Sequence, residues 1–151
     1  MSMTRENKDL IMKDLSGRLF YGVKCYIPES NEVKILGGIH EDGENTLFDF
    51  WEDSRKIVYD AQLYISEFKP YLFPLSSMTD ELWDKEFRGC SITEFTRDSF
   101  KYGCKTLEFN DGNPDLSSII RFINQLIKNH FDIYGLIPKG LAIDATGKNI
   151  Y

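Results

Sequence analysis

The chain has 151 residues, and its 18 basic and 24 acidic side chains give a formal net charge of -6. Hydrophobic residues make up 42% and aromatic residues 14% of the sequence, which is too apolar for a disordered chain and enough for a folded core. No apolar run approaches the roughly 18 residues that a membrane-spanning helix needs, and the charged start of the chain lacks a signal peptide's apolar segment. The acidic balance disfavours sequence-independent nucleic-acid binding, which relies on Lys and Arg. We therefore expect a cytoplasmic protein.

The first expected element is a helix over residues 4–17. Thr4 is a suitable N-cap, and Gly17 is expected to end the helix because glycine tolerates the left-handed conformation. The apolar residues at helical spacing are Leu10, Ile11, Leu15 and Leu19. The charged residues expected on the outer side are Lys8, Asp9, Lys13 and Asp14. The pattern is typical of an amphipathic helix that covers a sheet.

A run of short strands follows, over residues 21–27, 33–40, 46–51 and 56–65. Gly37 and Gly38 indicate a bulge or sharp bend, and residues 41–45 have the composition of a tight hairpin turn. Alternation predicts that Phe48 and Phe50 share one face of their strand, whereas Leu47, Asp49 and Trp51 share the other. The spacing predicts a small bent antiparallel sheet, and it also fits an SH3-like barrel.

The second half is expected to be helical with short strands. Two prolines between residues 68 and 75 argue against a central strand there, because proline lacks the N–H that a ladder requires. Helices are expected over residues 79–87 and 115–129, and residues 145–151 are expected to be loosely held. The apolar stripe of the second helix is Leu116, Ile119, Ile120, Ile123, Leu126 and Ile127.

Together these elements predict an α+β fold in a single domain over residues 1–151. It would have a barrel-like N-terminal half over residues 1–75, packed with a C-terminal α+β half over residues 76–151.

Residue types with catalytic or metal-binding chemistry are sparse. Cys25, Cys90 and Cys104 form no CxxC pair, and the alternation around Cys25 predicts a buried strand position. Only His40 and His130 are available as bases, and neither lies in a pattern with a cysteine or serine. The sequence thus indicates no catalytic residue, no metal ligand and no cofactor.

An acidic segment interleaved with aromatic residues is the one distinctive surface feature. No Lys or Arg lies between residues 40 and 54. The acids there are Glu41, Asp42, Glu44, Asp49, Glu52 and Asp53, and Trp51 is the aromatic anchor expected beside them. One interpretation is a hairpin whose acidic face is merely solvated. The other is a docking surface for a basic partner, in which charge speeds the encounter and aromatic rings supply affinity.

Two longer segments carry a resemblance to a known family. They are Lys69-Pro-Tyr-Leu-Phe-Pro-Leu-Ser-Ser-Met-Thr79 and His130-Phe-Asp-Ile-Tyr-Gly-Leu-Ile-Pro-Lys-Gly-Leu-Ala-Ile143, joined by Lys8–Leu15 and Arg18–Lys24. The chain resembles a family of small proteins of gut Bacteroides-type bacteria, their phages and mobile elements, to which no activity is assigned. The resemblance implies a bacterial or phage setting and an accessory role. It also draws attention to Tyr134, Leu136 and Lys139, in a loop that either wedges the preceding helix onto the sheet or is exposed for recognition.

These observations favour a non-enzymatic accessory factor that binds another protein through its acidic surface. Such a surface could act as an inhibitor by occupying the site of a host nucleic-acid-binding protein. Two alternatives stay open. One is a small-barrel nucleic-acid-binding module that uses Arg97, Lys101, Tyr102 and Lys105, and the other is a hydrolase. The sequence gives no oligomeric state.

Overall fold

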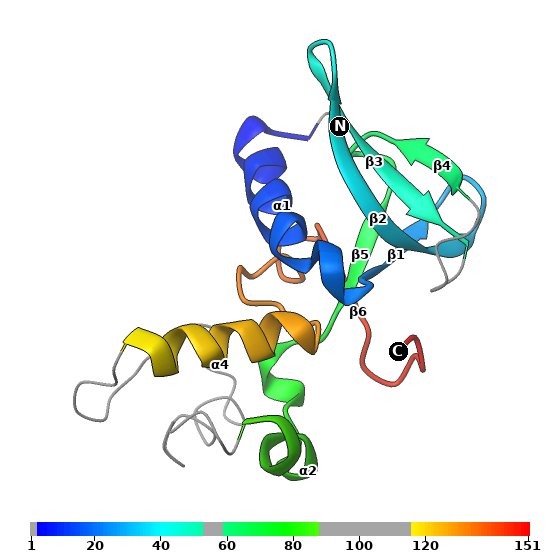
Figure 1. Cartoon of the computed structure of the whole chain (residues 1–151). Coiled ribbons are helices and arrows are strands. Elements are labelled where there is room, and N and C mark those ends of the chain that lie inside the picture. The colour runs from blue at the N-terminus through cyan, green and yellow to red at the C-terminus, as the bar shows by residue number, and fades with distance from the viewer. Residues whose placement is uncertain (1–2, 53–58, 88–115) are drawn as a thin grey trace.

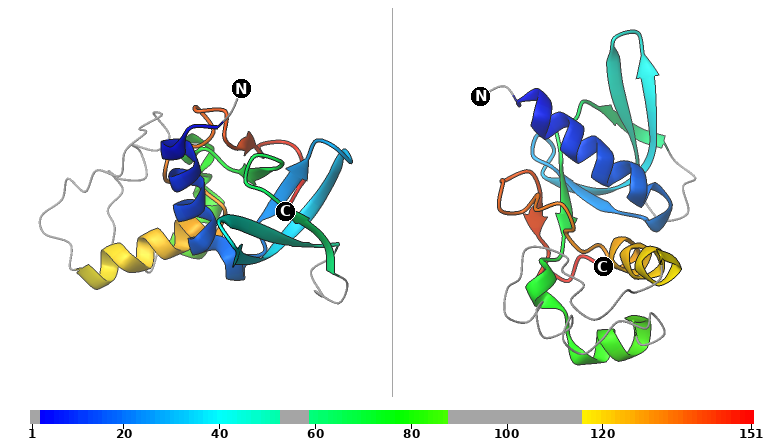
Figure 2. Two further views of the ribbon diagram at one scale, coloured as in Figure 1. Left: turned by 90° about the horizontal axis from the view of Figure 1, so that it is seen from above. Right: turned by 90° about the vertical axis from the view of Figure 1, so that its left-hand side faces the viewer.

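The computed structural model describes residues 3–52, 59–87 and 116–151. Its helical elements are α1 (Arg5–Arg18), η1 (Leu19–Tyr21), η2 (Leu75–Ser77), α2 (Asp80–Leu82), the π-helical turn η3 (Trp83–Phe87) and α4 (Leu116–Lys128). Its strands are β1 (Lys24–Ile27), β2 (Glu32–Asp42), β3 (Asn45–Trp51), β4 (Tyr59–Leu63), β5 (Lys69–Leu72) and β6 (Ile143–Asp144). Helix α1 packs against one face of the sheet, and α4 and α2 lie beyond one end of α1 (Figures 1 and 2).

The described strands form one open sheet in the order β4-β3-β2-β1-β5-β6. All neighbouring pairs are antiparallel except β5 and β6, which are parallel. The α+β fold expected from the sequence is therefore confirmed. The SH3-like barrel is wrong, because β4 and β6 stand at opposite edges of the described sheet and do not pair with each other. β6, which comes from the far end of the chain, extends the sheet beyond β5.

Helix α1 begins where the sequence predicts and ends later. The Thr4 side chain accepts a hydrogen bond from Asn7 N–H at 3.3 Å, as an N-cap does. The predicted end at Gly17 is wrong: α1 continues to Arg18, and the 3-10 helix η1 extends the helical segment to Tyr21, with Gly22 as its C-cap. Gly22 has φ +66°, so this glycine is the left-handed residue that ends the helical segment.

Strands β2 and β3 form the predicted hairpin and bulge. Their register shifts between Leu36 and Gly38, and a tight turn over residues 43–44 connects the strands. Gly43 has φ +64°, which a hairpin turn of this length requires. Phe48 and Phe50 are fully buried, which confirms the predicted face of β3. The tip of this hairpin extends beyond the other strands (Figure 1).

Strand β5 overturns the expectation that the proline segment stays outside the centre of the sheet. Pro70 is the register partner of Cys25 on β1, and β5 lies between β1 and β6. β1 pairs with Lys69 and Pro70 only, and β6 pairs with Tyr71 and Leu72 only. Because each neighbour pairs with just two residues, the missing proline N–H removes at most one ladder hydrogen bond.

Two apolar clusters make up the core of the described residues. The first lies between α1 and the sheet and includes Leu15, Val23, Cys25 and Phe48. The second joins α4 to η2 and η3; its members are Leu75, Met78, Trp83, Phe87, Phe122, Leu126 and Phe131. The first cluster also contains Leu136, Leu141 and Ala142. The C-terminal half of the chain thus returns to the core of the N-terminal half.

The buried side of α4 differs from the predicted stripe. Phe122 and Leu126 are fully buried, whereas Leu116 is 71% and Ile120 is 49% exposed. The reason is that the rings of Trp83 and Phe87 pack on Phe122 at centroid distances of 6.0 and 5.5 Å. The buried side of α4 therefore combines Phe122 with Leu126 of the predicted stripe, whereas Ile119, Ile123 and Ile127 of that stripe are half-buried.

Candidate functional site

The acidic hairpin presents some of the predicted docking surface. We use this name for Glu41, Asp42 and Glu44 at the tip of β2–β3, all of which are exposed. The Thr46 hydroxyl donates a hydrogen bond of 3.1 Å to Glu41 Oε1 across the strands. Glu52, just after β3, is also exposed, and Asp53 lies outside the described residues. The surface thus holds a compact group of acids at the tip.

The outer face of the hairpin holds Asp49 and Trp51, both half-buried. Trp51 lies against the bulge, since a Cβ on Gly37 would be only 1.5 Å from its Nε1. His40 Nδ1 lies 3.1 Å from Asp49 Oδ2, and Gln62 donates a 3.1 Å hydrogen bond to Asp49 Oδ1. Because these contacts fix the Asp49 side chain, it belongs to the wall of the hairpin more than to a freely accessible acidic surface.

The loop after α4 does not present the three residues that the resemblance pointed to as one surface. Leu136 is fully buried in the first cluster and cannot touch a partner, so its place among the partner-binding residues is wrong. Asp132 fixes the loop by accepting hydrogen bonds of 2.8 Å from the N–H groups of Leu136 and Ile137. Tyr134 is half-buried under Lys13, whose Nζ lies 5.1 Å from its ring centroid, and Lys139 is exposed.

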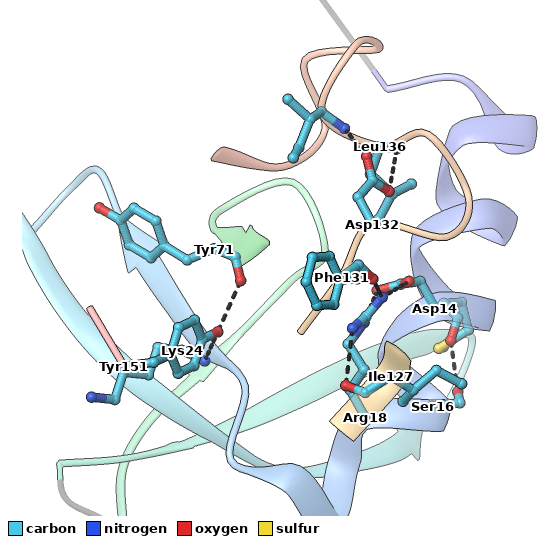
Figure 3. A network of polar contacts seen from close by, with 12 residues as sticks. Asp14, Ser16, Arg18, Lys24, Tyr71, Ile127, Phe131, Asp132, Leu136 and Tyr151 are labelled. Carbon is cyan, nitrogen blue, oxygen red and sulfur yellow. Dashed lines mark hydrogen bonds and ion pairs between the residues drawn. The ribbon is translucent and has the colours of Figure 1, made fainter. Parts of the chain in front are cut away.

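A buried ion pair joins α1 to the end of α4. Arg18 donates two hydrogen bonds of 2.7 Å to the Asp14 carboxylate, and both side chains are fully buried. Its guanidinium also donates to the carbonyl oxygens of Ile127 and Phe131 (Figure 3). The expectation that Asp14 faces solvent is therefore wrong. Burial raises the pKa of Asp14, although the hydrogen bonds and charge of Arg18 oppose the rise.

The end of the chain is held in place, contrary to the expectation of a loose tail. The Tyr151 hydroxyl donates a 2.8 Å hydrogen bond to the Tyr71 carbonyl and accepts one of 3.0 Å from Lys24 N–H (Figure 3). Lys24 Nζ donates a further bond of 2.6 Å to the Ile150 carbonyl. The register of β1 and β5 would make Lys24 and Tyr71 the next ladder pair. The phenol therefore bridges the point where these two strands separate.

We predict that Tyr151→Phe lowers the free energy of unfolding by about 1–1.5 kcal/mol, because it removes the hydrogen bonds of the phenol to Lys24 N–H and to the Tyr71 carbonyl at a site where Tyr151 itself is 41% exposed. Urea unfolding measures the difference. Tyr64→Phe is the matched control, since Tyr64 has a similar exposure of 49%, and it is expected to change stability by less than about 0.5 kcal/mol. Equal effects of the two variants would contradict the bridging role.

A cavity of about 450 Å³ lies beside His130. Its walls include Phe73, Leu82, Lys128, His130, Phe131 and Tyr151, and we call it the His130 cavity. The imidazole of His130 stacks on the Tyr151 ring at a centroid distance of 3.9 Å. His130 is only 8% exposed, and its Nδ1 has no hydrogen-bond partner among the described residues. Burial and the charges of Arg18 and Lys24 lower the pKa of His130 to about 4.

This low pKa makes stability depend on pH. In the unfolded chain His130 binds a proton near pH 6.5, whereas in the folded chain it stays neutral until about pH 4. Stability is therefore lost as the pH falls from 6.5 towards 4, and the expected loss at pH 5 is about 2 kcal/mol.

Urea unfolding of the wild type and of His130→Asn at pH 7 and pH 5 isolates this contribution. Asparagine suits the left-handed backbone at this position, where φ is +62°. The variant is expected to lose about 2 kcal/mol less than the wild type over this interval. Parallel losses in the two proteins would show that His130 does not titrate as described.

Among residues 3–52, 59–87 and 116–151, no three His, Cys, Asp or Glu side chains form a group that could hold a metal ion. Cys25 is buried as predicted, and burial raises the pKa of its thiol, which disfavours the reactive thiolate. Two groups of residues singled out in the sequence lie outside the described residues: the cysteines Cys90 and Cys104, and the candidate nucleic-acid-binding residues Arg97, Lys101, Tyr102 and Lys105.

Within the stretches of chain that the structure describes, no helix is long and apolar enough to span a membrane.

Sequence signals existed for only some of the residues that the structure brings together. Asp14 and Arg18 continue the helical spacing of Ile11 and Leu15, so the ion pair lies on the apolar side of α1. This spacing could have predicted that both charged side chains are buried. Nothing near His130 or Tyr151 in the sequence links them.

Searches of protein-family models, curated proteins and solved structures find no match to this chain.

Proposed function

We propose that this protein is a non-enzymatic accessory factor that binds another protein, and that the acidic hairpin docks on a basic surface of that partner. The observation that carries the proposal is the position of Glu41, Asp42 and Glu44 at the exposed tip of a projecting hairpin. The setting that the resemblance implies is the bacterial cytoplasm, with the gene on a phage or mobile element.

The core of the hairpin supports this proposal. Phe48 and Phe50 pack β3 against Phe68: the centroid of the Phe68 ring lies 5.0 Å from that of Phe48 and 4.9 Å from that of Phe50. The strands that carry the acidic tip are thereby anchored at their base, and a preorganised surface loses less entropy on binding than a mobile one. The charge at the tip then accelerates the encounter with a basic partner.

The outer face of the hairpin adds an apolar contact. Trp51 lies on the same face as Asp49 and is half-buried against Gly37. Tryptophan is enriched among residues that dominate binding energy. We propose Trp51 as the anchor, Glu52 as a flanking charge, and the tip as the group that steers the partner into place.

We propose that the partner is a host nucleic-acid-binding protein. The acidic hairpin would occupy its basic nucleic-acid-binding site in place of the phosphates. This form of the proposal predicts that the protein releases nucleic acid from its partner. Polyphosphate should compete with it for the same surface, because both are recognised through charge.

The test is affinity capture from a bacterial lysate at low and high salt. The variant Glu41→Gln, Asp42→Asn, Glu44→Gln removes the charge of the tip with little change in shape. A matched variant, Asp9→Asn, Glu29→Gln, Asp84→Asn, removes equal charge from exposed acids elsewhere.

We expect the wild type and the matched variant to capture a partner at low salt and lose it at high salt. The hairpin variant should fail at both. Equal capture by both variants would overturn the docking role of the acidic hairpin, and capture of no salt-sensitive partner by the wild type would overturn the proposed function.

A further inference from the structure

We propose that the His130 cavity is a binding site for a small aromatic carboxylate. This inference is independent of the acidic hairpin, which shares no residue with the walls of the cavity. The volume of about 450 Å³ falls in the range of small-molecule sites.

The walls of the cavity favour a planar ring. Phe73 lies between two other lining rings, 6.1 Å from Phe131 and 5.8 Å from Tyr151 by centroid distance. His130 continues this arrangement by stacking on Tyr151, with 12° between the ring planes. Aromatic rings prefer such offset and tilted neighbours at 4.5–7 Å. A ligand ring would therefore meet several aromatic partners at once.

The charges around the cavity favour an anion. Lys128 is the charged residue among the described residues that line it, and none of these is acidic. Glu86 forms an ion pair with Lys128 at 3.6 Å but does not belong to the wall. On the Tyr151 side, Lys24 Nζ lies 5.7 Å from the ring centroid and bonds to a neutral carbonyl. A ligand carboxylate can therefore share Lys128 with Glu86 in a locally positive environment.

The unmet hydrogen-bonding capacity of His130 is a second sign of a ligand. An unpartnered buried polar atom costs about 1–3 kcal/mol, and native structures contain few of them. His130 lines the cavity and is more than nine-tenths buried, yet its Nδ1 finds no partner in the described chain. Because this nitrogen is itself closed to solvent, a bound molecule would have to shift the imidazole ring to supply the missing hydrogen bond.

The test is a titration of the isotope-labelled protein with benzoate, followed by NMR signals of the His130 ring and of the Phe131 amide. Benzylamine, which has the same ring and the opposite charge, serves as the comparison. We expect saturable benzoate binding with a Kd of about 0.1–1 mM, as a ligand of this size allows, and no saturable binding of benzylamine.

Two lysines give a matched pair of variants, because both pair with Glu86 but only Lys128 lines the cavity. Lys128→Gln is expected to weaken benzoate binding about five- to tenfold, and Lys85→Gln should leave it unchanged. Equal binding of benzylamine, shifts that do not include His130, or equal effects of the two lysine variants would each overturn the proposal.

Discussion

Arg18→Met is expected to lower the free energy of unfolding by about 3–5 kcal/mol, because it leaves the Asp14 carboxylate buried without its cation. The same change removes the donors to the carbonyls of Ile127, in the last turn of α4, and of Phe131, just after it. A domain is stabilised by about 5–15 kcal/mol in total, so this single change removes a large share. The unfolding midpoint in urea, measured at constant pH, gives the difference.

A double variant separates the ion pair from simple loss of packing. Asp14→Leu combined with Arg18→Met replaces both charges by apolar side chains, and it is expected to be clearly more stable than Arg18→Met alone. Arg5→Met, at an exposed position of the same helix, is the control and should be nearly neutral. If the double variant were as unstable as the single one, the buried Asp14 charge would not be the cause.

Gly37→Ala is expected to destabilise the protein by about 2–3 kcal/mol, as overpacking of a close contact does. The added Cβ would lie 1.5 Å from Trp51 Nε1, so the indole would have to leave the bulge. The gain from a less flexible unfolded chain, about 0.4–1 kcal/mol, is smaller than this penalty. Thermal or urea unfolding measures the net effect.

Gly38→Ala is the neighbouring control. Its added Cβ would lie 2.7 Å from Asp49 Oδ2, a much less severe overlap than the 1.5 Å to the indole of Trp51. We expect a smaller loss there, and partial recovery of Gly37→Ala when it is combined with Trp51→Leu. Equal losses at the two glycines, with no recovery in the combined variant, would contradict the packing described for Trp51.

Local patterns predicted the elements whose signals lie within a few residues. Thr4 caps α1, the Gly37–Gly38 bulge bends β2, and the alternation of β3 puts Phe48 and Phe50 on one face, which the structure shows to be the buried one. Each depends on backbone preferences or on period-two spacing, which a single segment carries by itself.

Contacts between distant segments were not predictable in this way. β5 is central because β6 arrives from residues 143–144, and no local rule indicates this pairing. The buried side of α4 is set by Trp83 and Phe87, and Tyr151 is held by Lys24 and Tyr71. For the same reason the sequence left open whether the loop of Leu136 wedges α4 onto the sheet or is exposed for recognition, and the turn fixed by Asp132 directs Leu136 into the core.

The most direct test of the docking proposal is the association rate with the captured partner, measured at increasing ionic strength for the wild type and for the Glu41→Gln, Asp42→Asn, Glu44→Gln variant. Charge steering predicts that the wild-type rate falls steeply with salt. The variant should associate slowly at low salt and respond only weakly. If both proteins showed the same salt dependence, the acidic hairpin would not be the surface that meets the partner.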